Sequence, residues 1–299
     1  MKDLRSVEGF LVQLQQSQHL NVRQLAGVLL RKNVNKHWAK IPSQNQEPFK
    51  QLLLNILVNE TERLPRRAIA SVISKVAKHQ MQNWPELLQT ISLCCSHTEE
   101  AYREVGMLML YQQYDTVGQT LSKEFPALVQ LFSNALKDPS VRVRVMALKA
   151  CGALIESLAL EKSVLKFQAL IPLMISVIGE CVGCGEDDAA VQALEVFGEM
   201  AESPSPILKP HLEHIIRAVL TIGASTDVEL PVRDAALTIL SQLANNKPKT
   251  ISKMQLVPVI VETLLKINTE PVGSDEEDAE NDEDEDGMNI SASLTPHKM

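Results

Sequence analysis

Hydrophobic residues recur along most of the chain with the spacing of one buried helix face. Between residues 125 and 158, one set follows the i, i+3, i+4, i+7 pattern, and a second set begins after a polar break. The first set is Leu128, Leu131, Phe132, Ala135 and Leu136, and the second is Leu148, Cys151, Gly152, Ile155 and Leu158. The break contains Asp138-Pro139-Ser140, and a residue before proline is disfavoured in a helix. The pattern predicts a helical hairpin.

The same hairpin recurs along the chain. Prolines near the start of apolar segments are Pro48, Pro85, Pro126, Pro172, Pro210 and Pro258, which are 37 to 48 residues apart. Small residues follow the first five of them at offsets of 20 to 26: Ala68, Gly106, Ala147, Ala193 and Ala236. Because proline is tolerated in a first helical turn, each proline predicts a helix near its N-terminal end. A period of about 40–47 residues with two helices is typical of HEAT repeats, whereas ankyrin and TPR periods are shorter.

The predicted fold is therefore all-α: a HEAT-repeat solenoid of stacked antiparallel helical hairpins. We expect an opening helix pair in residues 1–40, from Val7–Gln16 and Leu20–Asn35. Residues 41–270 would hold about five hairpins and the first helix of another. Residues 271–293 would form a disordered acidic loop that displaces the next second helix, and residues 294–299 would begin a further helix. Because neither end carries a polar capping repeat, we expect the chain to be a piece of a longer solenoid.

Charge is concentrated in one segment. The chain has 37 acidic and 29 basic residues, a formal charge of −8. Ten of the acids are Asp275, Glu276, Glu277, Asp278, Glu280, Asp282, Glu283, Asp284, Glu285 and Asp286. Mutual repulsion predicts disorder there, either as a solvating linker or as a contact for a basic partner. The remaining chain is nearly neutral, which argues against a general nucleic-acid binder.

Other candidate chemistry is sparse. Cys181 and Cys184 form a lone C-x-x-C without further zinc ligands, and His211 and His214 lack the i, i+4 spacing of a zincin helix. No glycine-rich phosphate loop or nucleophile elbow occurs. The longest uncharged apolar run, Phe167–Gly179, is shorter than the roughly 20 residues of a membrane span. We therefore expect no enzyme activity, cofactor, metal site or membrane insertion.

Arginines gather where second helices are expected to begin: Arg66, Arg67, Arg142, Arg144 and Arg233. Second helices line the concave face of a HEAT solenoid, so these side chains are candidates for contact with acidic patches of a partner. Alternatively, they bond within their own repeat, as Arg142 or Arg144 would with Asp138. Trp38 and Trp84 are expected to be packing anchors between neighbouring hairpins.

The most specific motif lies in residues 21–38, where Arg23-Gln24-Leu25-Ala26 opens a helix that ends in basic residues before Trp38. Together with Glu60-Thr61-Glu62 and Trp84-Pro85-Glu86-Leu87-Leu88, it resembles the N-terminal signature of the importin-beta (karyopherin-beta) family. The family's very first helix has no counterpart here, and most of its solenoid would lie beyond Met299.

The resemblance implies a monomeric nuclear import receptor that shuttles between cytoplasm and nucleus through nuclear pores. Such receptors bind cargo on the concave face, Ran-GTP through N-terminal repeats and nucleoporin Phe-Gly repeats on the outer face, and Ran-GTP releases the cargo. The members that the chain resembles most favour basic cargo, notably core histones and ribosomal proteins, and direct nucleic-acid contact is not expected. The alternatives are a HEAT scaffold subunit of a multiprotein complex and a histone or ribosomal-protein chaperone without transport.

Overall fold

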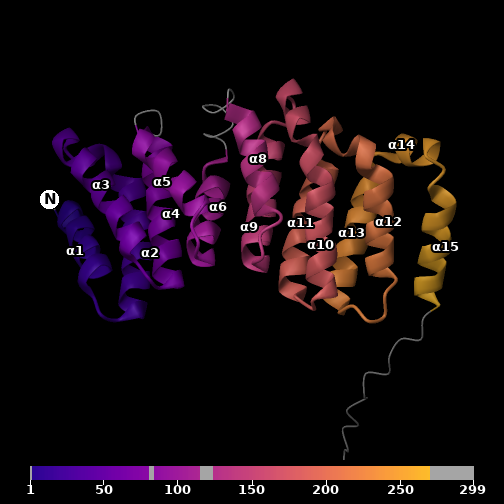
Figure 1. Ribbon diagram of the computed structural model, residues 1–299, viewed down its shortest axis with the longest axis horizontal. Coiled ribbons are helices and arrows are strands. Elements are labelled where there is room, and N and C mark those ends of the chain that lie inside the picture. Colours follow the sequence, from indigo (N-terminus) through magenta and orange to yellow (C-terminus); the bar gives the residue numbers. More distant parts are fainter. Residues whose placement is uncertain (1, 81–83, 115–123, 270–299) are drawn as a thin grey trace, which may run out of the picture.

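The computed structural model describes residues 2–80, 84–114 and 124–269. Within these ranges every regular element is a helix, and helix pairs follow one another along the long axis of the molecule (Figure 1). The pairs are α1 (Lys2–Gln16) with α2 (Leu20–His37), α3 (Ser43–Asn59) with α4 (Arg63–Gln80), α5 (Pro85–Cys95) with α6 (Glu100–Gln112), α8 (Phe125–Ala135) with α9 (Val141–Ser157), α10 (Ile171–Gly183) with α11 (Asp187–Glu202), and α12 (Leu212–Gly223) with α13 (Leu230–Asn246).

The second helices form a continuous row. α2, α4, α6, α9, α11 and α13 begin 43, 37, 41, 46 and 43 residues apart, and each packs on the next. Because each hairpin buries one face on its predecessor and the other on its successor, the repeats share a single core. This arrangement confirms the predicted HEAT-repeat solenoid.

Both predicted apolar faces of the α8–α9 hairpin are confirmed. Leu128, Phe132, Ala135 and Leu136 are buried, as is every member of the second set. Trp84 has no exposed surface, and the Trp38 ring meets Phe49 of α3 edge-on at 5.8 Å and stacks on His79 of α4 at 6.4 Å. Trp38 therefore packs its own hairpin against the next one, as expected.

Two prolines do not begin first helices. Pro48 is the sixth residue of α3, and Pro210 lies in the 3-10 helix η5 (Pro206–His211), which runs directly into α12. The first two helices are also longer than predicted. α1 begins at Lys2 instead of Val7, and α2 continues to His37 instead of Asn35. Among the helices whose N-cap is described, Ser205 before η5 is the residue whose side chain accepts a capping hydrogen bond, so the sequence has little to mark where these helices start.

The last described elements are α14 (Pro248–Lys253), which buries Ile251, and α15 (Val257–Asn268), which has no buried residue. The ten carboxylates from Asp275 to Asp286 lie outside the described residues. A 22-residue segment, Lys162–Gly183, has the length and hydropathy of a membrane span. It consists of the 3-10 helix η4 (Lys162–Leu170) and α10, and half of its apolar window is buried, as in the core helix of a helical repeat.

Candidate functional site

Arginines near the starts of four second helices make the same internal hydrogen bond. Each guanidinium donates to the main-chain carbonyl oxygen six residues earlier: Arg23 to Ser17 at 3.0 Å, Arg66 to Glu60 at 2.9 Å, Arg103 to His97 at 3.0 Å and Arg144 to Asp138 at 2.7 Å. These carbonyls lie in the turn between the two helices of a hairpin. Each arginine therefore ties its turn to the second helix.

Some of these side chains also pair with a carboxylate of the following repeat. Arg23 binds Glu60 at 2.8 Å, and Arg103 binds Asp138 at 2.6 Å, both through two nitrogens. These bidentate hydrogen bonds raise the pKa of both arginines. The carboxylates also accept main-chain N–H groups of their own turns, from Glu62 and Ser140. The ion pairs thus fix one repeat to the next at the hairpin turns.

The predicted arginines divide into two groups. Arg66 and Arg144 are buried, with Arg66 only 1% exposed, so they are structural rather than available to a partner. Arg233 donates to the carbonyl oxygen of Gly223 at 3.0 Å. The predicted bond to Asp138 is confirmed for Arg144, which donates to the Asp138 main-chain carbonyl, while the Asp138 carboxylate binds Arg103.

Arg67 and Arg142, in contrast, line one cleft of about 670 Å³ that crosses α4, α6, α9 and α11. At its floor the buried Glu104 carboxylate forms ion pairs with Arg63 and Arg67, each at 2.6 Å. Arg142 is exposed and makes no ion pair or hydrogen bond with the described residues. The cleft is therefore mixed in charge, and Arg142 is the arginine best placed to meet a partner there.

A neighbouring cleft of about 440 Å³ is acidic. It lies beside Tyr111 of α6, and its charged lining is Glu156 and Lys149 of α9 with Glu195 and Glu199 of α11, three carboxylates to one lysine. Partial desolvation, together with Glu199 and Glu202 nearby, raises the pKa of Glu156. α11 contains five carboxylates and no Lys or Arg, so this part of the second-helix row has a negative potential.

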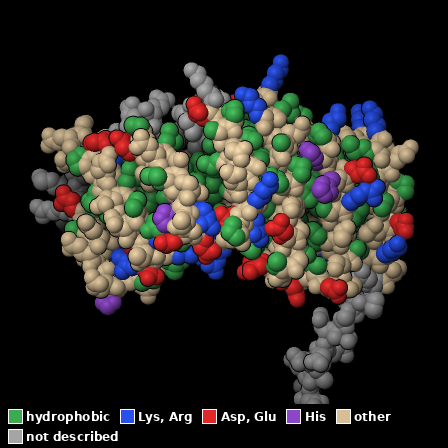
Figure 2. Space-filling model, in the orientation of Figure 1, with side chains coloured by type: hydrophobic (Ala, Val, Ile, Leu, Met, Phe, Trp, Pro, Cys, Tyr) green, Lys and Arg blue, Asp and Glu red, His purple; other side chains and the backbone are tan. Residues whose placement is uncertain are grey.

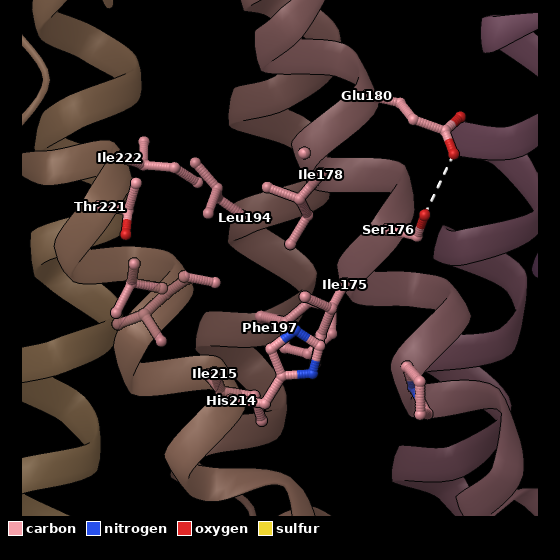
Figure 3. A pocket seen from close by; sticks show the side chains of 15 residues that line it. Ile175, Ser176, Ile178, Glu180, Leu194, Phe197, His214, Ile215, Thr221 and Ile222 are labelled. Atoms are coloured by element: carbon pink, nitrogen blue, oxygen red, sulfur yellow. Dashed lines mark hydrogen bonds between the residues drawn. The ribbon is translucent and has the colours of Figure 1, made fainter.

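An apolar groove of about 550 Å³ lies between the first helices α10 and α12. Phe197 of α11, Ile175 and Ile178 of α10, and Ile215 and Ile222 of α12 point into it, while His214 stands at its edge (Figure 3). Figure 2 shows hydrophobic side chains reaching the surface of this face beside histidines. The groove has the shape and polarity of a site for aromatic or aliphatic side chains.

The other candidates are not assembled into sites. Cys181 is buried and Cys184 exposed at the end of α10, and burial raises the pKa of Cys181 to about 11. Among the described residues, no cluster of three His, Cys, Asp or Glu side chains has the geometry of a metal site. His211 and His214 lie at the start of α12, where His214 borders the apolar groove.

Comparison with known protein families identifies the family of this chain. The family model described as "IPO5-like, TPR repeats" matches residues 61–218, and that of the "Importin-beta N-terminal domain" matches residues 9–59. The chain belongs to the importin-beta family. The two matches together run from within α1 to within α12, so they leave out α13, α14 and α15.

Relatives within the importin-beta family are several times longer. The chain is 26% identical to mouse importin-4 over 269 residues, which is 88% of this chain and 25% of that protein. It is 28% identical to a probable importin subunit beta-4 of Schizosaccharomyces pombe over 258 residues, 85% of this chain and 24% of that protein. The crystal structure of Kap121p matches with a TM-score of 0.75 at 22% identity, covering 83% of this chain and 24% of that one. The chain thus spans about a quarter of the length of these relatives.

Sequence reasoning missed several residues of this importin-beta solenoid. Arg23, Arg63 and Arg103 were not selected, although Arg23, Arg66, Arg103 and Arg144 recur at intervals of 43, 37 and 41 residues, in phase with the second helices. This periodicity could have identified these arginines from the sequence. Glu104 and the groove residue Phe197 had no such signal, because their roles depend on how neighbouring repeats stack.

Proposed function

We propose that the protein is a nuclear import receptor that carries basic cargo and releases it when Ran-GTP binds. The observation that carries the proposal is the match of residues 9–59 to the importin-beta N-terminal domain, with the helical repeats continuing directly from it. Ran-GTP would bind through the N-terminal repeats, on the row of second helices. The receptor would shuttle between cytoplasm and nucleus as a monomer.

The apolar groove between α10 and α12 supports an outer-face site for nucleoporin Phe-Gly repeats. A phenylalanine side chain needs an apolar cavity, and the isoleucines around Phe197 offer one between two first helices. Kap121p, a structural relative, has been crystallised with Nup53p, and it shares the fold at 22% identity. The flanking Gly of each repeat would let the peptide backbone approach α10 and α12 closely.

Basic cargo, such as core histones or ribosomal proteins, would meet two acidic elements. The first is the run from Asp275 to Asp286, and the second is the cleft of Glu156, Glu195 and Glu199. Electrostatic complementarity of this kind speeds association and weakens as salt rises. In the proposal the acid run captures cargo and the second-helix row orients it.

The function is tested by loading the protein onto immobilised core histones and washing with Ran-GTP or Ran-GDP. We expect Ran-GTP alone to release the protein. A variant with all ten acids of the run changed to their amides should bind histones more weakly at low salt and show a shallower salt dependence. If that variant keeps the wild-type affinity and salt slope, the acid run does not bind cargo. If neither form of Ran releases the protein, the transport proposal fails.

The acid run also favours one other function, a chaperone that shields basic chains without transport. Ten carboxylates within twelve residues, Asp275 to Asp286, are suited to neutralising histone tails whether or not Ran takes part. Histone binding that depends on the acid run but is insensitive to Ran-GTP would favour this chaperone over the receptor.

A further inference from the structure

A polar groove of about 430 Å³ opens between the first helices α1 and α3, at the N-terminal end of the solenoid (Figure 1). Among the described residues, its lining has no aromatic ring, and its charged side chains are Arg23 and Glu60, which pair with each other at 2.8 Å. Five carboxamide side chains line it: Gln15, Gln16, Gln18, Asn55 and Asn59. This amide groove is therefore polar but electrically neutral.

Grooves at the same place between later first helices are lined differently. Between α5 and α8, a groove of about 410 Å³ combines two carboxamides, Gln130 and Asn134, with the apolar side chains of Met107 and Leu131. Between α10 and α12 lies the apolar groove described above. Because the repeats stack equally well around these other linings, the five carboxamides between α1 and α3 are not a requirement of the repeat architecture.

The carboxamides of α3 form a ladder along one exposed side of the helix. Asn55 and Asn59 line the groove, and Gln51 lies one turn before them. The three are four residues apart, so neighbours are separated by about 6 Å along the helix axis. In an extended peptide, every second residue faces the same side, about 6.6 Å apart. The two spacings nearly match, so successive amides of α3 can meet alternate peptide units of an extended chain.

Hydrogen bonds within the ladder leave one donor and one acceptor unused. The Asn59 Nδ2 donates to the main-chain oxygen and to the Oδ1 of Asn55, at 2.8 Å each. Among the described residues, nothing bonds to the Asn55 Nδ2 or the Asn59 Oδ1, and the side chains of Gln15, Gln16 and Gln18 make no hydrogen bond. A carboxamide carries the same donor and acceptor as a peptide unit. The groove thus offers partners for a polypeptide main chain on both of its sides.

We propose that the amide groove binds an extended, uncharged polypeptide segment of a partner protein through the main chain of that segment. Carboxamides from α1 and α3 donate to its carbonyl oxygens and accept from its N–H groups, as the edge of a β-sheet does. A charged ligand gains little, because Arg23 and Glu60 neutralise each other. A nucleic acid fits less well, since the described lining has no ring on which a base could stack. The inference goes beyond the proposed function, because it involves neither Ran nor a basic cargo.

The test uses the 299-residue chain and an eight-residue peptide of alternating serine and asparagine, with blocked ends and an uncharged fluorophore. A second peptide has the same side chains but carries methyl groups on alternate main-chain nitrogens, which removes those donors. Fluorescence anisotropy is recorded for both at low and high salt. We expect the unmodified peptide to bind equally well at both salt concentrations and the methylated peptide to bind about tenfold more weakly. Equal binding of the two peptides, or no binding of the unmodified one, would overturn the proposal.

Two double variants then assign the binding to the amide groove. The test variant is N55A with N59A, and the matched control, N245A with N246A, removes two exposed asparagines at the end of α13. Both variants keep the net charge, and both replace asparagine by a better helix former, so both should fold. We expect the test variant to bind the unmodified peptide about tenfold more weakly and the control to bind it like the wild type. Equal affinities of the two variants would overturn the proposal.

A competition experiment distinguishes a partner protein from the chain itself, since residues 287–293 are also an uncharged segment. An unlabelled peptide with the sequence of residues 287–293 should displace the labelled peptide no better than unlabelled serine–asparagine peptide does. Displacement at a tenfold lower concentration would assign the groove to the chain's own segment, and would overturn the proposal of a partner protein. None of these measurements depends on Ran or histones, so their failure leaves the proposed function untouched.

Discussion

Arg66 is buried at the start of α4, where its guanidinium donates to the Glu60 carbonyl and lies 4.0 Å from the centroid of the Tyr102 ring. Arg142, at the start of α9, is exposed and unpaired among the described residues. Both arginines lie near the start of a second helix but have different energetic roles, because only the buried one donates to a main-chain carbonyl and stacks on an aromatic ring.

Replacing Arg66 by Met should therefore lower the free energy of unfolding by about 2 kcal/mol, through the lost carbonyl bonds and ring contact. The matched variant Arg142→Gln should stay within about 0.5 kcal/mol of the wild type. Urea denaturation followed by circular dichroism measures both. Equal destabilisation by the two substitutions would contradict the assignment of Arg66 as a structural residue.

Among the described residues, Glu156 is a carboxylate whose surroundings disfavour its charge. Glu156 is exposed, but partial desolvation, with Glu199 and Glu202 nearby, raises its pKa in the folded protein, so folding favours the protonated form. Since the folded state then binds the proton more tightly than the unfolded state, the stability contributed at Glu156 falls as the pH rises from the unfolded-state pKa through the raised folded one. At neutral pH the ionised side chain is a net penalty.

Glu156→Gln should consequently raise the thermal midpoint at pH 7. The gain should vanish below about pH 4, where the side chain at position 156 is neutral in the wild type as well as in the variant. Glu8→Gln, at another exposed glutamate on α1, is the control and should change the midpoint little at either pH. A gain from Glu156→Gln that is the same at pH 4 and pH 7 would exclude the electrostatic explanation.

At the scale of helices, close packing within and between hairpins depends on small residues at the contacts. A Cβ atom at Gly106 of α6 would come within 2.6 Å of the Cys95 Sγ and 2.9 Å of the Cys95 nitrogen, at the end of α5. Gly179 of α10 faces open space. Substituting Gly106 therefore tests the packing of α5 against α6, whereas substituting Gly179 tests only the helix preference of the residue.

Gly106→Ala should destabilise the protein by about 1–3 kcal/mol, because α5 and α6 would have to move apart. Gly179→Ala should stabilise it by about 0.5–1 kcal/mol, since alanine favours an α-helix and meets no neighbour there. Thermal unfolding of both variants is the measurement. If Gly106→Ala proves as stable as Gly179→Ala, α5 and α6 do not pack as described.

The helices were predictable from the sequence because each carries an apolar face at helical spacing, as in Leu128 to Leu136. Their ends were less predictable, since α1 and α2 extend past the expected Val7 and Asn35. Cross-repeat contacts could not be predicted. Arg23 and Glu60 are 37 residues apart, and only the stacking register of two hairpins brings their side chains to 2.8 Å.

At the scale of the whole molecule, the net charge of −8 conceals a strongly uneven distribution. α2 and α4 contain Lys and Arg but no Asp or Glu, whereas α11 contains Asp and Glu but no Lys or Arg. Ten further carboxylates lie from Asp275 to Asp286. A partner that lies along the row of second helices therefore meets positive charge near the N-terminus and negative charge further on. This polarity would orient a bound protein along the solenoid.

The proposed receptor function depends on discrimination between the two nucleotide states of Ran. The most direct measurement is the affinity of the 299-residue chain for Ran-GTP and for Ran-GDP, by biolayer interferometry with immobilised chain. The account predicts binding of Ran-GTP at least tenfold tighter than Ran-GDP, a difference of about 1.4 kcal/mol. Equal affinity for both forms, or binding of neither, would contradict it.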